Sequence, residues 1–130
     1  MADRGPIIPS GSEAMYDRFH FAPAFRVGNT IYVSGVIGTG ADGSVPDDAA
    51  EEFGNAFAAL AATLEAAGSG TADIVEITSV HTDMGDLGAF MAAKDGVISE
   101  PYPAWTAIGC TGLAIPGARA EVKATAVVAD

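Results

Sequence analysis

The stretch Arg119-Ala-Glu-Val-Lys-Ala-Thr-Ala126 decides the fold class, because its side chains alternate between two kinds. Charged or polar residues occupy every second position, and small apolar residues lie between them. A period of two residues is typical of a β-strand with one polar and one apolar face. Since the apolar face carries only small groups, a helix can pack closely on it. We therefore predict a strand over 119–128, with Glu121 inside it and on the face away from the helices.

The strongest helix signal lies between residues 48 and 67. Apolar side chains recur there at spacings of three and four residues, which places them on one side of an α-helix. They are Phe53, Ala56, Phe57, Leu60, Leu64 and Ala67. Asp48, followed by Glu51, is suited to cap the first turn, and Gly68 is suited to end the last one. The pattern predicts a long helix whose apolar side faces the sheet.

The remaining elements follow from shorter patterns. Further strands are expected at 22–27, 30–37, 72–83 and 104–111. Gly28-Asn29 predicts a hairpin turn, 86–98 a second helix, 38–46 a loop and 1–18 a loose lead-in. The order β-β-α-β-α-β-β in one domain of 130 residues predicts an α+β fold with one sheet and two helices on one face. The other face needs cover, which predicts self-association.

Composition and charge limit the functions open to the chain. With 17 acidic and 6 basic residues, its formal net charge is −11. Such a surface repels phosphate backbones and anionic lipids, so we expect neither nucleic-acid nor membrane binding. Cys110 is the single cysteine, which excludes an internal disulfide. No signal peptide or apolar stretch of about 18 residues is present, and the expected location is the cytoplasm.

Residues 38–43, Gly-Thr-Gly-Ala-Asp-Gly, match the GxGxxG pattern of dinucleotide-binding loops. In such loops the third glycine lies in the first turn of a helix, where backbone N–H groups meet pyrophosphate. Here the five residues Ser44-Val-Pro-Asp-Asp48 follow Gly43 before the first full turn of the predicted helix, and the nearby Asp42, Asp47 and Asp48 would repel phosphates. The chain is also too short for the sheet that usually accompanies this motif. We therefore expect an ordinary loop and no cofactor.

Other chemically capable residues lack a supporting pattern. Ser34 does not follow the first glycine of a GxSxG elbow, so we expect a strand serine that hydrogen-bonds to backbone or ligand. His81 and Asp83 alternate on one strand and offer two metal ligands, but His20 is the only other histidine, and no metal site is expected. Cys110, among small residues, is expected in the core.

Glu121 is the best candidate for chemistry. It lies within a strand between Ala120 and Val122, not in a loop. A strand carboxylate in a partly dry cleft can position water or act as a general base toward it. The alternative is an ordinary ion pair with Arg119 or Lys123, which the sequence leaves open.

Several stretches, in the same order along most of the chain, are similar to the Rid/YjgF family (reactive intermediate deaminase, L-PSP). They are Val27-Gly-Asn-Thr-Ile-Tyr-Val-Ser-Gly35, Leu64-Glu-Ala-Ala-Gly68, Asp73-Ile-Val-Glu-Ile-Thr78, Pro103-Ala-Trp-Thr106 and Ala120-Glu-Val-Lys-Ala-Thr-Ala126. The resemblance implies a chorismate-mutase-like homotrimer with small-molecule clefts between subunits. It also implies hydrolysis of 2-imino or enamine acids to a 2-oxo acid and ammonia. By the same resemblance, Glu121 orients the attacking water, and Ser34 and Gly35 line the cleft.

Four positions depart from the pattern of the family's deaminases. Trp105 stands where those enzymes have an arginine that clamps the substrate carboxylate, and Lys94 stands where they usually have asparagine. Phe21 replaces a tyrosine, and Ala107 replaces a cysteine found in some members. Tryptophan cannot imitate a bidentate guanidinium–carboxylate contact. We therefore predict a more aromatic site, formed by Trp105, Phe21, Lys94 and Glu121, for a flat or apolar ligand with one anionic group.

Two functions of different class remain open at this level. One is a deaminase-type hydrolase acting on an imine-like or amide-like substrate, and the other is a non-catalytic trimeric protein that binds a small organic acid. The endoribonuclease activity attached to the family's older name is disfavoured by the net charge of −11. Within the site itself, the alternative is that Lys94 pairs with Glu121 or solvent while Trp105 only fills the space left by the arginine.

Overall fold

The computed structural model describes residues 4–129, which form one sheet flanked by helices. The strands are β1 (Arg4–Ile7), β2 (Ala24–Val27), β3 (Thr30–Val36), β4 (Ile74–His81), β5 (Ala104–Gly109) and β6 (Ala120–Val127). The helices are α1 (Glu13–Phe19), α2 (Ala49–Ala66) and α3 (Leu87–Asp95), with 3₁₀ turns η1 (Thr71–Asp73) and η2 (Met84–Asp86). The six strands lie in the order β1-β2-β3-β6-β4-β5, and only the β4–β5 pair is parallel.

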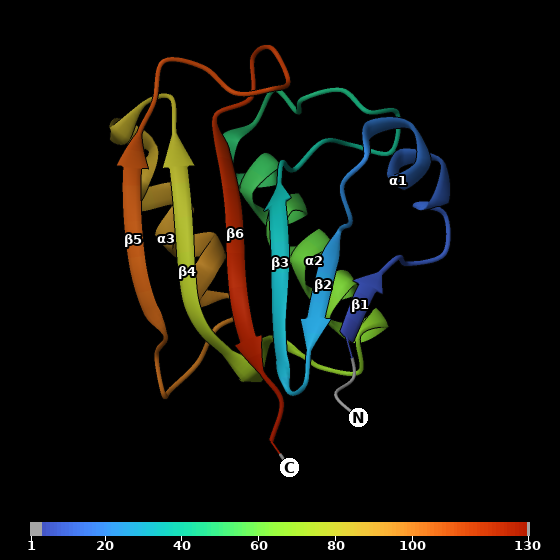
Figure 1. Cartoon of the computed structure of the whole chain (residues 1–130). Coiled ribbons are helices and arrows are strands. Elements are labelled where there is room, and N and C mark those ends of the chain that lie inside the picture. Colours follow the sequence, from blue (N-terminus) through green and yellow to red (C-terminus); the bar gives the residue numbers. More distant parts are fainter. Residues whose placement is uncertain (1–3, 130) are drawn as a thin grey trace.

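Strand β6 lies in the middle of the sheet, between β3 and β4. Its small apolar residues are buried while Glu121, Lys123 and Thr125 are not, which confirms the alternation predicted from the sequence. Helices α2 and α3 cover one face together, behind the sheet in Figure 1. From β2 onward, the order of elements is the predicted β-β-α-β-α-β-β, so the α+β fold class is confirmed.

The core lies between α2, α3 and the covered face of the sheet. Its aromatic centre is Phe90 of α3, whose ring centroid lies 5.5 Å from that of Phe53 and 5.2 Å from that of Phe57. All three rings are buried. Phe53 and Phe57 belong to the apolar stripe predicted for α2, and this stripe therefore fixes where α3 can pack.

The two ends of α2 differ in how well the sequence anticipates them. Gly68 has φ of +79°, and the amides of Gly68 and Ser69 donate to the carbonyls of Glu65 and Leu64, as in a Schellman motif. At the other end Asp48 is the N-cap residue, but its side chain makes no capping hydrogen bond. The expected capping box is therefore wrong, although the position of the helix start is right.

A buried ion pair, which the sequence pattern did not indicate, joins the start of α2 to the start of β6. Glu52 is fully buried and lies 2.7 Å from the Arg119 guanidinium. It also accepts the backbone N–H of Arg119 at 2.8 Å, while the guanidinium donates to the carbonyls of Pro46 and Asp47. These contacts satisfy a carboxylate that would otherwise be costly to bury.

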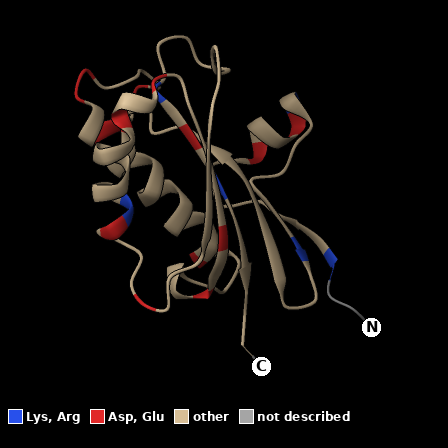
Figure 2. Cartoon of the chain, turned by 90° about the vertical axis from the view of Figure 1, so that its left-hand side faces the viewer, with Lys and Arg blue, Asp and Glu red and all other residues tan. Residues whose placement is uncertain are grey.

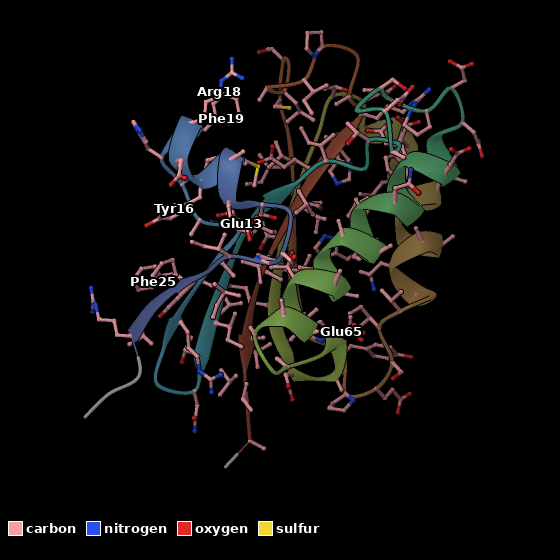
Figure 3. All side chains as sticks on the ribbon, turned by 90° about the vertical axis from the view of Figure 1, so that its right-hand side faces the viewer. Glu13, Tyr16, Arg18, Phe19, Phe25 and Glu65 are labelled. Atoms are coloured by element: carbon pink, nitrogen blue, oxygen red, sulfur yellow. The ribbon has the colours of Figure 1, made fainter. Side chains whose placement is uncertain are left out.

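The expectation of a loose lead-in over residues 1–18 is wrong for its described part. Residues 4–7 form β1, which pairs with β2 at the sheet edge, and residues 13–19 form α1. No residue of α1 is buried, so its sequence carries no apolar stripe that could reveal it. Figure 3 shows α1 on the side of the sheet opposite α2 and α3. Residues 1–3 lie outside the described part.

Residues 38–46 form the loop predicted in place of a nucleotide-binding turn. Gly38 lies so close to α2 that an added Cβ would meet the carbonyl oxygen of Glu52 and lie 2.7 Å from the amide of Ala56. Gly40 and Ser44 close the loop through a 2.8 Å backbone hydrogen bond. The first glycine of the motif therefore allows close packing between the loop and α2.

The acidic balance of the sequence extends over several elements of the fold. Figure 2 shows the few Lys and Arg positions spread over separate elements, with no continuous basic stripe. Extended nucleic-acid surfaces concentrate such residues on one face or groove. No helix within residues 4–129 is long and apolar enough to cross a membrane.

Candidate functional site

A cavity of about 360 Å³ lies beside Glu121, where the chain leading from α1 passes β3 and β2 begins. Its walls come from the α1 region, from β3, from α2 and from the loop before β6. The lining includes Met15, Phe21, Ser34, Gly35, Ile115 and Glu121. The structure therefore brings together four of the residues selected from the sequence, namely Phe21, Ser34, Gly35 and Glu121.

Gly35 determines where the carboxylate of Glu121 lies. A Cβ at position 35 would overlap Oε2 of Glu121 and lie 2.7 Å from its Cδ and 2.9 Å from its Cγ. The pairing of β3 with β6 shifts by one residue between Val33 and Val36, which indicates a bulge around Gly35. The glutamate side chain thus lies directly against backbone that only glycine leaves uncovered.

The carboxylate of Glu121 has no ion-pair partner within residues 4–129. Arg119, which the sequence offered as a partner, is held by Glu52 on the other side of the strand. Lys123 is exposed and forms no ion pair with any described carboxylate. The geometry therefore argues against the ordinary ion pair and leaves the carboxylate open to water or ligand.

Ser34 fixes the mouth of this cavity. Its hydroxyl donates to the carbonyl of Ala22 at 2.6 Å, and its amide donates to the carbonyl of Pro23 at 2.9 Å. The two bonds hold the chain next to Phe21, which is 43% exposed and also lines a neighbouring cavity of about 370 Å³. Because the Ser34 hydroxyl proton is used, its oxygen can still accept a hydrogen bond but is poorly placed to act as a nucleophile.

Lys94 and Trp105 form a second group on the other face of the sheet. The Lys94 ammonium lies 5.2 Å from the centroid of the Trp105 indole and 2.9 Å from Oδ1 of Asp95. Neither residue lines the cavity at Glu121. Trp105 packs against α3, which covers the opposite face, so the two groups do not meet within one chain.

Three buried residues that the sequence analysis did not assign to the site surround Trp105. Its indole Nε1–H donates to Oγ of Ser79 at 2.9 Å, and that oxygen lies 2.8 Å from Nε2 of His81. Phe90 stacks on the indole at a centroid distance of 6.0 Å and meets the His81 ring edge-on at 4.7 Å. These four side chains form a closed ring of contacts, and we call it the Trp105 ring.

The environment of His81 favours its neutral form. Burial lowers the pKa of His81 below 6.5, and the negative charge of Asp86 opposes this shift. Nδ1 of the buried imidazole has no hydrogen-bond partner among the described residues. Asp83, which the sequence places two residues away, accepts the amide of Gly85 instead. The part of the chain that the structure describes contains no group of three or more potential metal ligands.

The two small residues of interest on this side take minor positions. Ala107 pairs with Ser79 in the parallel register of β5 on β4 and is partly buried, but it does not line the cavity at Glu121. Cys110 follows β5, and its amide donates to the carbonyl of His81 at 2.8 Å. It is only partly buried, so the expectation of a core cysteine is wrong. The strand ends before Cys110, at Gly109.

Comparison with known proteins places this geometry in a family. The family model described as Endoribonuclease L-PSP matches residues 12–128. The RutC family protein YjgH of Escherichia coli (strain K12) is 36% identical over 132 residues, covering 100% of this chain and 99% of that protein. A 2-iminobutanoate/2-iminopropanoate deaminase of Dermatophagoides farinae is 28% identical over 114 residues, covering 83% and 85%.

A solved structure of Protein YJGH has 36% sequence identity to the chain and covers 98% of each, with a TM-score of 0.85. The fold with six strands and three helices matches that structure and is consistent with the chorismate-mutase-like architecture expected from the sequence. Since the family model covers most of the chain and a relative aligns with its full length, the protein belongs to the Rid/YjgF family, also called L-PSP.

Proposed function

We propose that the protein binds an imine or small organic acid in clefts between subunits and hydrolyses the imine with Glu121 positioning the water. The observation that carries this proposal is the unpaired carboxylate of Glu121, held against Gly35 in a mostly apolar cavity. A carboxylate in such surroundings can orient water and take up its proton. The deaminase names of similar proteins support the same reaction class.

The reaction needs no group beyond the imine and water. The water oxygen bonds to the imine carbon while the C=N π electrons move to nitrogen, giving a carbinolamine. Its C–N bond then breaks, and the product is a 2-oxo acid with ammonia. The protons released from oxygen end on the departing nitrogen, and among the described residues that line the cavity Glu121 is the acidic side chain that can relay them.

The separation of the two residue groups supports an assembled site. Glu121 lies on β6 and Trp105 on β5, with β4 between them, and their side chains point to opposite faces. Because the sheet itself lies between the two side chains, one small ligand cannot contact both within a chain. In a homotrimer, the Trp105 and Lys94 of one chain would face the Glu121 cavity of the next.

This arrangement favours a flat or apolar substrate with one anionic group. The indole supplies a stacking surface, and the Lys94 ammonium, which is paired with Asp95, supplies a point charge in place of an arginine fork. The imine of a simple aliphatic amino acid should be a poor substrate. Losing a bidentate charged contact removes roughly 2–4 kcal/mol of transition-state binding, a factor of about 30 to 1,000 in rate.

Non-catalytic binding of the same ligands is the second candidate. The observation that favours it is that the Ser34 hydroxyl already donates to the carbonyl of Ala22, so within residues 4–129 no second acid–base side chain lines the cavity with Glu121. Endoribonuclease activity is disfavoured by the net charge of −11, and we expect no binding of single-stranded RNA at physiological salt.

Ammonia release from imines generated in solution by an amino-acid oxidase tests the proposal. We expect faster release over background with the imine of phenylalanine than with that of alanine, and none above background with Glu121→Gln. Equal rates for wild type and Glu121→Gln would refute the catalytic role. Light scattering at micromolar concentration should give the mass of three chains, and a monomer would refute the assembled site.

A further inference from the structure

We infer that Ser79 and His81 are positioning residues, which hold the indole of Trp105 as a fixed wall for the ligand. This inference rests on the proposed function, because it concerns the same assembled site. Ser79 and His81 are buried polar residues, and neither lines the Glu121 cavity. Their hydrogen bonds would make the site prefer an aromatic ligand.

The hydrogen bond between Trp105 and Ser79 has a fixed direction. The indole N–H can only donate, so at 2.9 Å from Nε1 the Ser79 oxygen is an acceptor. The neutral imidazole of His81 can complete this contact in either tautomer: Nε2, 2.8 Å from the Ser79 oxygen, accepts the hydroxyl hydrogen, or Nε2–H donates to that oxygen. The lowered pKa of His81 keeps the imidazole in that form at neutral pH.

The positions of Ser79 and His81 on β4 make this chain of bonds rigid. Both residues are fully buried, and as alternate residues of one strand they point to the same face of the sheet. In the parallel register Trp105 is opposite Ile77, so its indole reaches diagonally to Ser79. The indole, on the edge strand β5, is therefore held by the neighbouring strand β4.

Helix α3 also packs against the indole. Phe90 stacks on it, and Lys94, one helical turn later, places its ammonium 5.2 Å from the ring centroid. Lys94 is only 8% exposed, and its ammonium donates a hydrogen bond to Asp95. The combination gives a flat apolar surface with a cation beside it, which matches an aromatic 2-oxo or 2-imino acid better than an aliphatic one.

A purely structural role would predict a different result from a positioning role. If Ser79 and His81 only satisfied each other in the core, their loss would lower stability without changing ligand preference. Since Trp105 is the single tryptophan, its fluorescence and its indole N–H resonance report on this site alone. Both signals can be read in the intact protein without any turnover.

The test compares Ser79→Ala with Ser69→Ala, a matched control that loses a serine hydroxyl bonded to Asp73 ahead of β4. In Ser79→Ala we expect a shifted indole N–H resonance with faster hydrogen exchange. We also expect phenylpyruvate to bind about 3- to 10-fold more weakly, the effect of one lost hydrogen bond, while the weak binding of pyruvate stays unchanged. His81→Gln, which keeps a polar group toward Ser79, should fall between Ser79→Ala and wild type. Ser69→Ala should behave as wild type.

The outcomes separate this inference from the proposed function. An unchanged indole resonance in Ser79→Ala, or equal weakening of phenylpyruvate and pyruvate, would overturn the positioning role even if imines are hydrolysed. Failure of wild type to bind phenylpyruvate would overturn it as well. If Ser79→Ala selectively lost phenylpyruvate binding while wild type released no ammonia from any imine, the positioning role would be supported and hydrolysis would be refuted.

Discussion

The Glu121 cavity and the Trp105 ring use polar groups in opposite ways. At Glu121 the carboxylate lacks any ion-pair partner among the described residues, and the backbone of Gly35 clears the space around it. Around Trp105 the indole N–H, Ser79 Oγ and His81 Nε2 are joined by hydrogen bonds, while Nδ1 of His81 has no partner among the described residues. An open polar group suits chemistry, whereas a closed network suits a fixed surface. The comparison suggests a division between reaction and recognition.

Glu121→Gln should have the largest effect, and it should be confined to one side of the comparison. Loss of a group that positions or deprotonates water costs about 10²- to 10⁴-fold in rate. Because Gln has nearly the same shape, binding of phenylpyruvate and the melting temperature should change little. Ammonia release and thermal unfolding measure the two parts, and a large loss of stability would place Glu121 among the structural residues.

Phe90→Ala should act on the other side. It removes the ring that contacts Phe53, Phe57, His81 and the indole, and such core truncations cost about 3–5 kcal/mol. Urea unfolding should show this loss, and Trp105 fluorescence should shift toward that of an exposed indole. Phe90→Leu is the milder control. Unchanged fluorescence in a folded Phe90→Ala protein would contradict the closed ring.

Gly35→Ala should displace the carboxylate of Glu121 without removing it. The added Cβ overlaps the carboxylate, so the side chain must move, and displacement of a catalytic group by about 1 Å can cost 10²-fold in rate. We expect a 10- to 100-fold loss of ammonia release with little change in the Trp105 emission. Gly5→Ala is a suitable control, because a Cβ there meets nothing within 4 Å. Full activity in Gly35→Ala would show that Glu121 can work from another position.

The smallest effect should be a pH dependence of stability that comes from the Trp105 ring. The pKa of His81 is lowered in the folded protein, so the unfolded chain binds the proton more tightly. This contribution to stability is present above pH 6.5 and is lost as pH falls toward the folded pKa. As the pH is lowered from 7.5 to 5, the melting temperature of His81→Gln should therefore decrease less than that of wild type. Equal decreases would contradict the buried neutral imidazole.

The fold was largely predictable because its signals are periodic. The alternation around Glu121 and the stripe of α2 depend on which face is buried, and burial is what sequence periodicity records. Helix α1 has no buried residue, and β1 joins the sheet through backbone bonds at an edge, so neither leaves a pattern. The capping role of Asp48 was wrong for another reason: the sequence indicates where the helix begins, but not whether the Asp48 side chain forms a hydrogen bond there.

The site was only half predictable for a similar reason. Phe21, Ser34, Gly35 and Glu121 were selected one by one, and the fold places them in one cavity. Their expected convergence with Trp105 does not occur within a chain, and whether it occurs between chains remains a prediction. The role of Ser79 depends on a diagonal contact between parallel strands far apart in the sequence, which no local spacing encodes.

The ion pair between Glu52 and Arg119 bears on the register of the central strand, β6. A β-strand that slips by one residue exchanges its two faces, which here would turn the Glu121 carboxylate into the core and expose Ala120 and Val122. Arg119 begins this stretch and is fastened at both its backbone amide and its guanidinium to a glutamate 67 residues earlier. The contact therefore fixes the register of β6, and the register determines which side of the sheet carries Glu121.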